Sequence, residues 1–369
     1  MLSEKQIFEL ATLQDLNLLE ELSESDFELL KWHGTLPLLS EKVKSLNLPI
    51  FQKTFLEQNA KFLIYKKQLK SIEDDFAECG LKPILLKGVT CLVDSSYFPN
   101  PKMRQMVDFD FWLKGSDFDI FLEFANKKGF VLKEKFSENG KITKATFHKK
   151  GDLLTIEIHR DLLTNSFQNY FDEEDAFNSA RLTENSKIFR ILTREWHIIL
   201  RLAHDTLANH YLLKLRAVYL LEIYWNLKNL DGNYSQLNSI VKDKKLKKLF
   251  GFYCGLAIRN YGNDFALPFE KSQEEFQFEV GQWQKFQSRN QNYYHAESRF
   301  FRISLNVNIV NKIQDIFRIL WLENTWHYST NFLIQEYKIK NPLFKIPVFL
   351  KAFHFLKLAL LFLKTSITS

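Results

Sequence analysis

The sequence contains few of the residues that interrupt regular structure. Its 369 residues include only 12 glycines and 8 prolines, against 35 phenylalanines. So few breakers favour long helices with few irregular loops, in a chain long enough for a buried core and two structural units. Phenylalanine at helical spacing is typical of a packed core, so its abundance by itself indicates no particular chemistry.

Cysteine is also scarce. Cys79, Cys91 and Cys254 are odd in number and have no metal-binding spacing. A disulfide framework is therefore not expected, and a reducing cytoplasm is the simplest location. Charged residues interrupt residues 1–19, which lack the apolar stretch that a secretory signal requires.

The chain has no large excess of charge of either sign. Its 50 basic and 44 acidic residues leave a formal charge of +6. This mild excess does not indicate nucleic acid as a partner, although it is compatible with a substrate that carries phosphate.

The spacing of apolar residues divides the chain into four regions. Residues 1–80 have helical spacing, residues 81–190 combine strands with a helix, and residues 191–340 return to helical spacing. Residues 341–369 are predicted to form a basic, apolar C-terminal helix. We therefore predict an α+β fold, in which a small mixed β-sheet forms a core flanked by helical N- and C-terminal regions.

Within residues 81–190 the pattern predicts about four strands and at least one helix. The expected strands are residues 84–86, 107–113, 145–148 and 153–159, and the expected helix is residues 117–128. Beyond this region, residues 196–230 have the periodicity of one long helix.

Two carboxylates are spaced so that they share one face of a predicted strand. In an extended strand, residues i and i+2 point to the same side, so Asp108 and Asp110 project together. Like charges this close repel each other unless a cation lies between them. The neighbouring Phe109, Phe111 and Trp112 argue against an ordinary solvated acidic face. Because Mg²⁺ binds one or two carboxylates together with substrate phosphates, the pair is a candidate magnesium site.

A third carboxylate lies on a later predicted strand. Glu157 and His159 form a second i, i+2 pair. If the two strands are neighbours, two carboxylates can hold metal while the third orients or deprotonates a nucleophile, as phosphoryl transfer requires. The alternatives are an exposed strand acid for Glu157 and a packed, hydrogen-bonded side chain for His159.

A turn suited to phosphate follows the first predicted strand. Gly88 allows backbone N–H groups to approach a phosphate, and Lys87 precedes it with a positive charge. Arg104 lies in a polar loop shortly before the paired aspartates, where it can contact a phosphate or simply be solvated. Lys87 can likewise extend to solvent at the end of its strand.

The order of these motifs resembles the polymerase-β nucleotidyltransferase superfamily. More narrowly, it resembles an uncharacterised bacterial branch with a Leu-Lys-Gly element, an arginine shortly before Asp-x-Asp, and a Glu-x-His strand. The likeness extends over roughly residues 20–230. The usual superfamily element is Gly-Gly or Gly-Ser, whereas this chain has Lys87-Gly88 followed by Val89, which makes Thr90 the candidate for the missing serine.

The resemblance implies a nucleotidyltransferase core in residues 81–190 and a role for each motif. The implied catalytic and metal-binding residues are Asp108, Asp110 and Glu157. The implied nucleotide-binding residues are Lys87, Gly88, Arg104 and His159. The activity would be Mg²⁺-dependent transfer of a nucleotidyl group from a nucleoside triphosphate to an acceptor that the sequence does not identify. The alternative is a non-catalytic protein on the same scaffold that binds a nucleotide or a partner.

The end of the chain raises a separate question. Residues 342–369 contain several lysines and no acidic residue among mostly apolar side chains, and the lysines make this segment a poor membrane span. Such a helix either packs on its own domain or docks on a membrane surface or a protein partner. The expected location is the cytoplasm, with peripheral membrane attachment as the alternative.

Overall fold

The structure is a computed structural model that describes residues 2–3, 6–7, 9–10, 22–43, 48–138, 140–163, 171–204 and 216–243, with Leu246, Phe250 and Tyr253. The chain divides into two compact units. The first comprises Met1–Leu202, Arg216–Lys244 and Asn260–Gly262 and contains the whole described β-sheet. The four regions expected from the sequence, with boundaries at 80, 190 and 340, stay a prediction.

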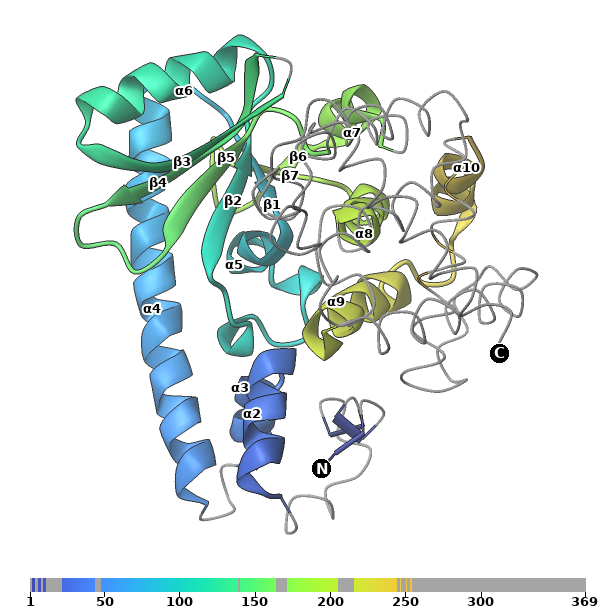
Figure 1. Ribbon diagram of the computed structural model, residues 1–369. Helices are drawn as coiled ribbons and strands as arrows, with labels where there is room; N and C mark the ends of the chain where they lie inside the picture. Colours follow the sequence, from blue (N-terminus) through green and yellow to red (C-terminus); the bar gives the residue numbers. More distant parts are fainter. Residues whose placement is uncertain are drawn as a thin grey trace, which may run out of the picture. The chain divides into compact units, whose positions relative to one another are not determined.

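A seven-stranded mixed β-sheet lies in the first unit, in the order β3-β4-β5-β2-β1-β7-β6 (Figure 1). β2 is parallel to β5 and β1 is parallel to β7, while the other neighbours are antiparallel. This mixed sheet with flanking helices confirms the predicted α+β class. Its strands are β1 (Ile84–Leu86), β2 (Asp108–Trp112), β3 (Phe130–Glu138), β4 (Lys141–Lys149), β5 (Thr155–His159), β6 (Arg181–Leu182) and β7 (Arg190–Ile191).

The expectation of about four strands was wrong, because the sequence did not predict β3, β6 and β7. β6 and β7 have two residues each, too few to establish a period. β3 lies at one end of the sheet order, and its exposed residues include Lys133, Glu134 and Lys135 in succession. It therefore lacks the alternation of a half-buried strand.

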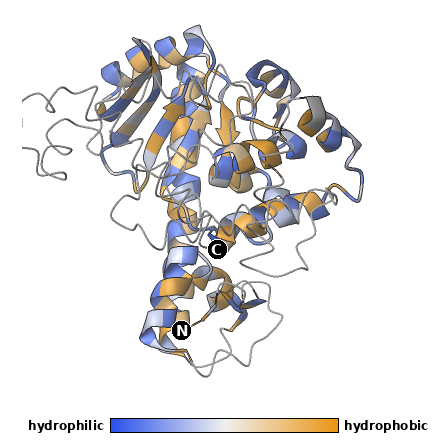
Figure 2. Ribbon diagram, turned by 45° about the vertical axis from the view of Figure 1, so that its right-hand side comes forward, coloured by the Kyte–Doolittle hydropathy of each residue, from blue (hydrophilic) through white to orange (hydrophobic). Residues whose placement is uncertain are grey.

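Two helices cover one face of the sheet. In Figure 1, α4 (Pro49–Glu78) runs behind the strands and α6 (Ser116–Lys127) lies along their upper end. The ring centroid of Phe76 on α4 is 5.1 Å from that of Phe111 on β2 and 4.7 Å from that of Phe121 on α6. Hydrophilic and hydrophobic residues alternate along several strands in Figure 2. On β2, Asp108 and Asp110 alternate with Phe109 and Phe111, so the two aspartates point away from these helices.

The helix boundaries follow local capping chemistry. α2 (Glu24–His33) begins with a capping box formed by Ser23 and Asp26, and it ends at Gly34, whose φ is 70°. α4 ends just before Gly80, whose φ is 71°, as the sequence predicted. The remaining helices are α3 (Leu36–Lys42), α5 (Thr90–Val93), α7 (Glu173–Ser179), α8 (Arg194–Ala203), α9 (Ala217–Lys228) and α10 (Ser235–Asp243).

The prediction of one helix over residues 196–230 was wrong. α9 begins anew at Ala217, because Arg216 is extended, with φ −80° and ψ 130°. The N–H of Ala217 donates to Nδ1 of His33 at 3.1 Å, and Nε of Arg216 donates to the carbonyl of Trp32 at 2.6 Å. The end of α2 therefore caps the start of α9, a contact between distant segments that periodicity cannot reveal.

Within the described part of the chain, every helix is too short or too polar to cross a lipid bilayer. The predicted C-terminal helix, residues 341–369, lies outside the described residues. Its docking on a membrane surface or a partner stays a prediction.

Candidate active site

The two aspartates of the Asp-x-Asp motif lie on the face of β2 that points away from α4. Phe109 and Phe111 alternate with them and are fully buried. Asp110 is only 3 % exposed, whereas Asp108, at the start of the strand, is half-buried. The predicted strand therefore places both carboxylates on one face.

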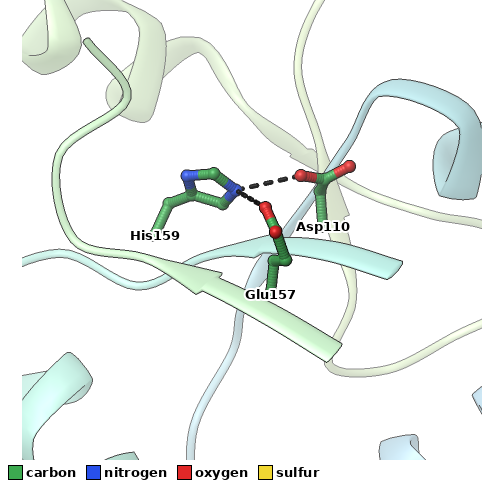
Figure 3. A group of neighbouring side chains, drawn as sticks. All are labelled: Asp110, Glu157 and His159. Atoms are coloured by element: carbon green, nitrogen blue, oxygen red, sulfur yellow. Dashed lines mark hydrogen bonds and ion pairs between the residues drawn. The ribbon is translucent and has the colours of Figure 1, made fainter. Parts of the chain in front are cut away.

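β5 brings a third carboxylate beside them. In the parallel pairing of β2 with β5, Asp110 lies opposite Glu157 and Trp112 lies opposite His159. One ligand atom each from Asp110, Glu157 and His159 lie within 4.8 Å of one another. In Figure 3 these three side chains point toward one another from the two strands. The two acidic motifs of the sequence thus meet on neighbouring strands.

His159 joins the two carboxylates. Its Nε2 lies 2.9 Å from Oδ1 of Asp110 and 3.5 Å from Oε2 of Glu157 (Figure 3). An ionised carboxylate can only accept a hydrogen bond, so Nε2 carries a hydrogen and donates it to Asp110. In this arrangement the ring holds Asp110 in place.

Lys87 is a strained residue next to the carboxylates. It follows β1, in which Leu86 pairs with Asp110. Its φ of 53° lies in the left-handed region, which costs a residue with a side chain roughly 1–2 kcal/mol. Its Nζ lies 2.7 Å from Oδ1 of Asp110. Such strain persists only where the surroundings enforce it, and it is concentrated at functional sites.

A second lysine, which the sequence analysis missed, lies next to Glu157. Nζ of Lys144 on β4 is 3.2 Å from both carboxylate oxygens of Glu157 and 4.3 Å from the ring centroid of Phe136. In the antiparallel pairing of β4 with β5, Lys144 faces His159 and Thr146 faces Glu157. The predicted strand began at residue 145 and left this lysine out. Its alternation with Thr146 was the available signal.

The three carboxyl groups differ in the direction of their pKa shifts. Burial, and then the charge of Asp110, raise the pKa of Asp108 to about 7. Burial also acts on Asp110, but Lys87 and His159 outweigh it and hold the pKa of Asp110 well below its usual range. Burial of Glu157 is likewise outweighed, chiefly by the hydrogen bond from His159, and its pKa falls to about 2. Asp108 is therefore the carboxyl group with the least compensation, and a cation beside it would relieve the repulsion.

The turn after β1 has little spare room. Gly88 lies in a 3₁₀ turn that leads directly into α5, and a Cβ there would lie 3.2 Å from Cγ of Met106 and 3.6 Å from Cζ of Arg104. Thr90 is fully buried, and its hydroxyl donates to the carbonyl of Leu85 at 3.2 Å. Thr90 thus has a hydrogen bond within the fold, and its contact with a phosphate stays a prediction.

Arg104 lies in a buried ion pair. Its Nη2 is 2.8 Å from Oε2 of Glu222 on α9, and its Nη1 donates to the carbonyl of Gln105. Nε2 of His197 on α8 lies 3.0 Å from the other oxygen of Glu222. Nε of Arg104 is buried and has no hydrogen-bond partner among the described residues. Arg104 therefore ties the loop before β2 to α9, and its contact with a phosphate stays a prediction.

The donor atoms of the site suit a hard divalent cation. Asp108, Asp110 and Glu157 offer carboxylate oxygens on one face of two neighbouring strands, and such oxygens are the protein ligands that Mg²⁺ prefers. The nitrogen of His159 that faces them is already hydrogen-bonded to Asp110. The set therefore fits Mg²⁺ better than a transition metal that favours imidazole.

Comparison with known proteins identifies the family of this chain. A family described as uncharacterised nucleotidyltransferase matches residues 25–262, a stretch that includes every residue of the site. No curated protein and no solved structure matches the chain. Because the matched stretch covers more than half of the chain, this protein belongs to that family of uncharacterised nucleotidyltransferases.

Proposed function

We propose that this chain transfers a nucleotidyl group from a nucleoside triphosphate to an acceptor, with Mg²⁺ as cofactor, on a core of the polymerase-β type. The observation that carries the proposal is the convergence of Asp110, Glu157 and His159 within 4.8 Å, next to the turn that bears Lys87 and Gly88. Membership of the family supports the class of reaction. The pairing of the Asp-x-Asp strand with the Glu-x-His strand supports the polymerase-β type.

Each residue has a part in this proposal. Asp108 and Asp110 hold Mg²⁺, with Glu157 as the third carboxylate. When bound, the metal polarises the α-phosphate and stabilises negative charge on the leaving pyrophosphate. Gly88 lets the backbone approach the phosphates, and Lys87 supplies a positive charge beside them.

The reaction exchanges one bond at the α-phosphorus for another. An oxygen or nitrogen of the acceptor forms a bond to the α-phosphorus, the bond from that phosphorus to the bridging oxygen breaks, and pyrophosphate leaves. Glu157 orients the attacking group by accepting its hydrogen bond, and the proton passes through it to solvent. His159 keeps Asp110 in position throughout.

The test is a calorimetric titration of the protein with each ribonucleoside triphosphate, with and without Mg²⁺. The same titration is made on the double variant Asp108→Asn/Asp110→Asn. A matched control exists in the chain, because Asp117 and Asp119 form a second Asp-Phe-Asp at the start of α6. The variant Asp117→Asn/Asp119→Asn makes the same chemical change outside the carboxylate cluster, although Asp119 pairs with Arg160, the residue after His159.

We expect Mg²⁺-dependent binding of one triphosphate that is lost in the site variant and kept in the control. Absence of binding for every triphosphate would contradict the proposal. Binding that survives the site substitutions, with no pyrophosphate released in any acceptor screen, would instead favour the non-catalytic binding protein.

A further inference from the structure

Two carboxylates of the site are each paired with a lysine of the chain, and the two lysines lie on opposite sides. Lys87, after β1, contacts Asp110 at 2.7 Å. Lys144, on β4, contacts both oxygens of Glu157 at 3.2 Å. In the sheet order β4-β5-β2-β1, these lysines bracket the two strands that bear the acidic residues. A divalent cation that binds the same oxygens has to displace both ammonium groups.

The free-energy cost of displacing the two ammonium groups depends on which other acceptors they can reach. Lys87 is largely buried, and its side chain is 12 % exposed. A buried ammonium without a partner is strongly unfavourable. A free divalent cation offers the released lysines no new acceptor. A polyphosphate that arrives with the cation offers several charged oxygens within reach of the same face.

We propose that Lys87 and Lys144 are resident counter-ions that make the site select a metal-bound polyphosphate over the free metal ion. The inference rests on the proposed function. It deepens that function by assigning Lys144 as a second phosphate-binding residue and by naming a metal-bound polyphosphate as the ligand of the site. The left-handed backbone of Lys87 supports it, because a glycine would adopt this φ without strain but would carry no ammonium. The position of Lys144 supports it as well, since the Phe136 ring 4.3 Å from its Nζ holds the side chain over the site.

The first experiment measures the affinity for free Mn²⁺, a paramagnetic substitute for Mg²⁺, by electron paramagnetic resonance without nucleotide. The variants are Lys87→Met and Lys144→Met in the full chain. Lys149→Met is a close control: it lies on the same strand, its Nζ contacts Asp75 at 2.6 Å, and it is 5.0 Å from the Phe130 ring. The two β4 lysines are also equally exposed, 26 % for Lys144 and 27 % for Lys149.

We expect each site variant to bind free Mn²⁺ about tenfold more tightly than the unaltered protein, the effect of one nearby charge on a carboxylate. The control should not change. Because Lys87→Met leaves Asp110 with one partner fewer and can impair folding, circular dichroism accompanies each titration. Lys144→Met, at the more exposed position, tests the inference by itself.

The second experiment measures binding of the Mg²⁺ complex of each ribonucleoside triphosphate by calorimetry at constant free Mg²⁺. We expect the site variants to bind this complex about tenfold more weakly, the opposite of their effect on free metal. Unchanged or weaker Mn²⁺ binding in Lys144→Met would overturn the inference, even where the unaltered protein binds a triphosphate. Tighter Mn²⁺ binding with undiminished binding of the complex would overturn the selection of polyphosphate. If no triphosphate binds to the unaltered protein, the proposed function fails, and the inference that rests on it fails too.

Discussion

Asp110 of β2 and Glu157 of β5 lie directly opposite each other in the parallel register of two central strands. Like charges in this relation repel, and Asp110 is almost fully buried. Lys87 and His159 offset the repulsion, because both contact Oδ1 of Asp110, at 2.7 and 2.9 Å. A buried cluster of like charges lowers stability, and such a cost is typical of sites that give up stability for function.

The first prediction concerns the carboxyl group with the least compensation. The pKa of Asp108 is raised to about 7 from 3.8. The folded protein therefore binds this proton more tightly than the unfolded chain, so it loses stability as the pH rises from about 4 to about 7. Asp108→Asn removes that loss. Because Asp108 is half-buried and solvent screens part of its charge, the free energy of unfolding should rise by about 2 kcal/mol at pH 8 in EDTA, less than the full shift would give.

Chemical denaturation at pH 8 and pH 4.5 checks this prediction. The gain should shrink at pH 4.5, where the carboxyl group of Asp108 keeps its proton in the folded protein. Asp117→Asn on α6 is the control, and it should give no gain at either pH, because an acidic residue in the first turn of a helix is favourable. A gain of equal size at both pH values would contradict the assignment to charge repulsion.

The second prediction concerns acid sensitivity away from the site. Burial, and then the charge of Arg216, lower the pKa of His33 to about 4 from 6.5. As the pH falls below 6.5, His33 binds a proton in the unfolded chain, whereas in the folded protein it binds one only at about pH 4. Over this window His33 should remove about 3 kcal/mol of stability.

His33→Asn isolates this effect. The side-chain oxygen of asparagine can accept the hydrogen bond that Nδ1 of His33 receives from the N–H of Ala217, but it does not titrate. The variant should be less sensitive than the unaltered protein between pH 6.5 and 4 in urea denaturation. Other groups titrate equally in both proteins, so parallel curves would show that His33 is not responsible.

The candidate site shows what a single sequence can and cannot predict. The tripeptide Asp-Phe-Asp occurs twice, at 108–110 and 117–119. On β2 it places two carboxylates on one face, while on α6 the same spacing turns them apart. The alternation of residues 107–113, which breaks at Gly115-Ser116, indicated a strand, whereas residues 117–128 have helical spacing. The acidic pair on β2 and its Glu157-x-His159 partner could therefore be predicted.

The remaining features depend on contacts between distant segments. His33 accepts a hydrogen bond from Ala217, and Arg104 is paired with Glu222. Neither relation has a local pattern, because it arises only when α9 packs against α2 and against the loop before β2, both far away in the sequence. Lys144 was missed for a different reason. The first half of β4 is mostly half-buried and has polar residues on both faces, so the predicted strand began too late.

The third prediction concerns the buried pair of Arg104 and Glu222. Removing one partner leaves the other charge buried, so Arg104→Met and Glu222→Gln should each cost about 3 kcal/mol of stability. The double variant should cost clearly less than the sum, which a double-mutant cycle by urea denaturation measures. Additive losses would show that the 2.8 Å contact contributes little.

The same variants address the predicted phosphate contact of Arg104. Its guanidinium is engaged by Glu222, so a purely structural role predicts unchanged affinity of folded Arg104→Met for the Mg²⁺–triphosphate complex. A phosphate contact predicts a loss of about tenfold or more in affinity, because an interaction of an arginine with a phosphate is charge-assisted. Calorimetry at a temperature where the variant remains folded decides between the two.

The last prediction concerns Gly88. An alanine Cβ there would lie 3.2 Å from Cγ of Met106, a flexible side chain that can yield by a few tenths of an ångström, so Gly88→Ala should cost less than about 1 kcal/mol of stability. If the backbone at this turn approaches a phosphate, the added methyl group keeps the phosphate away, and the affinity for the Mg²⁺–triphosphate complex should fall at least tenfold. Cys91→Ala is the control, since Sγ of Cys91, a buried residue of α5, donates to the carbonyl of Gly88 at 3.0 Å. That variant should lower stability by a similar amount and leave the affinity unchanged. Equal losses of affinity in both variants would mean that the turn is only sensitive to its own packing, whereas a loss confined to Gly88→Ala would place the phosphate against this glycine.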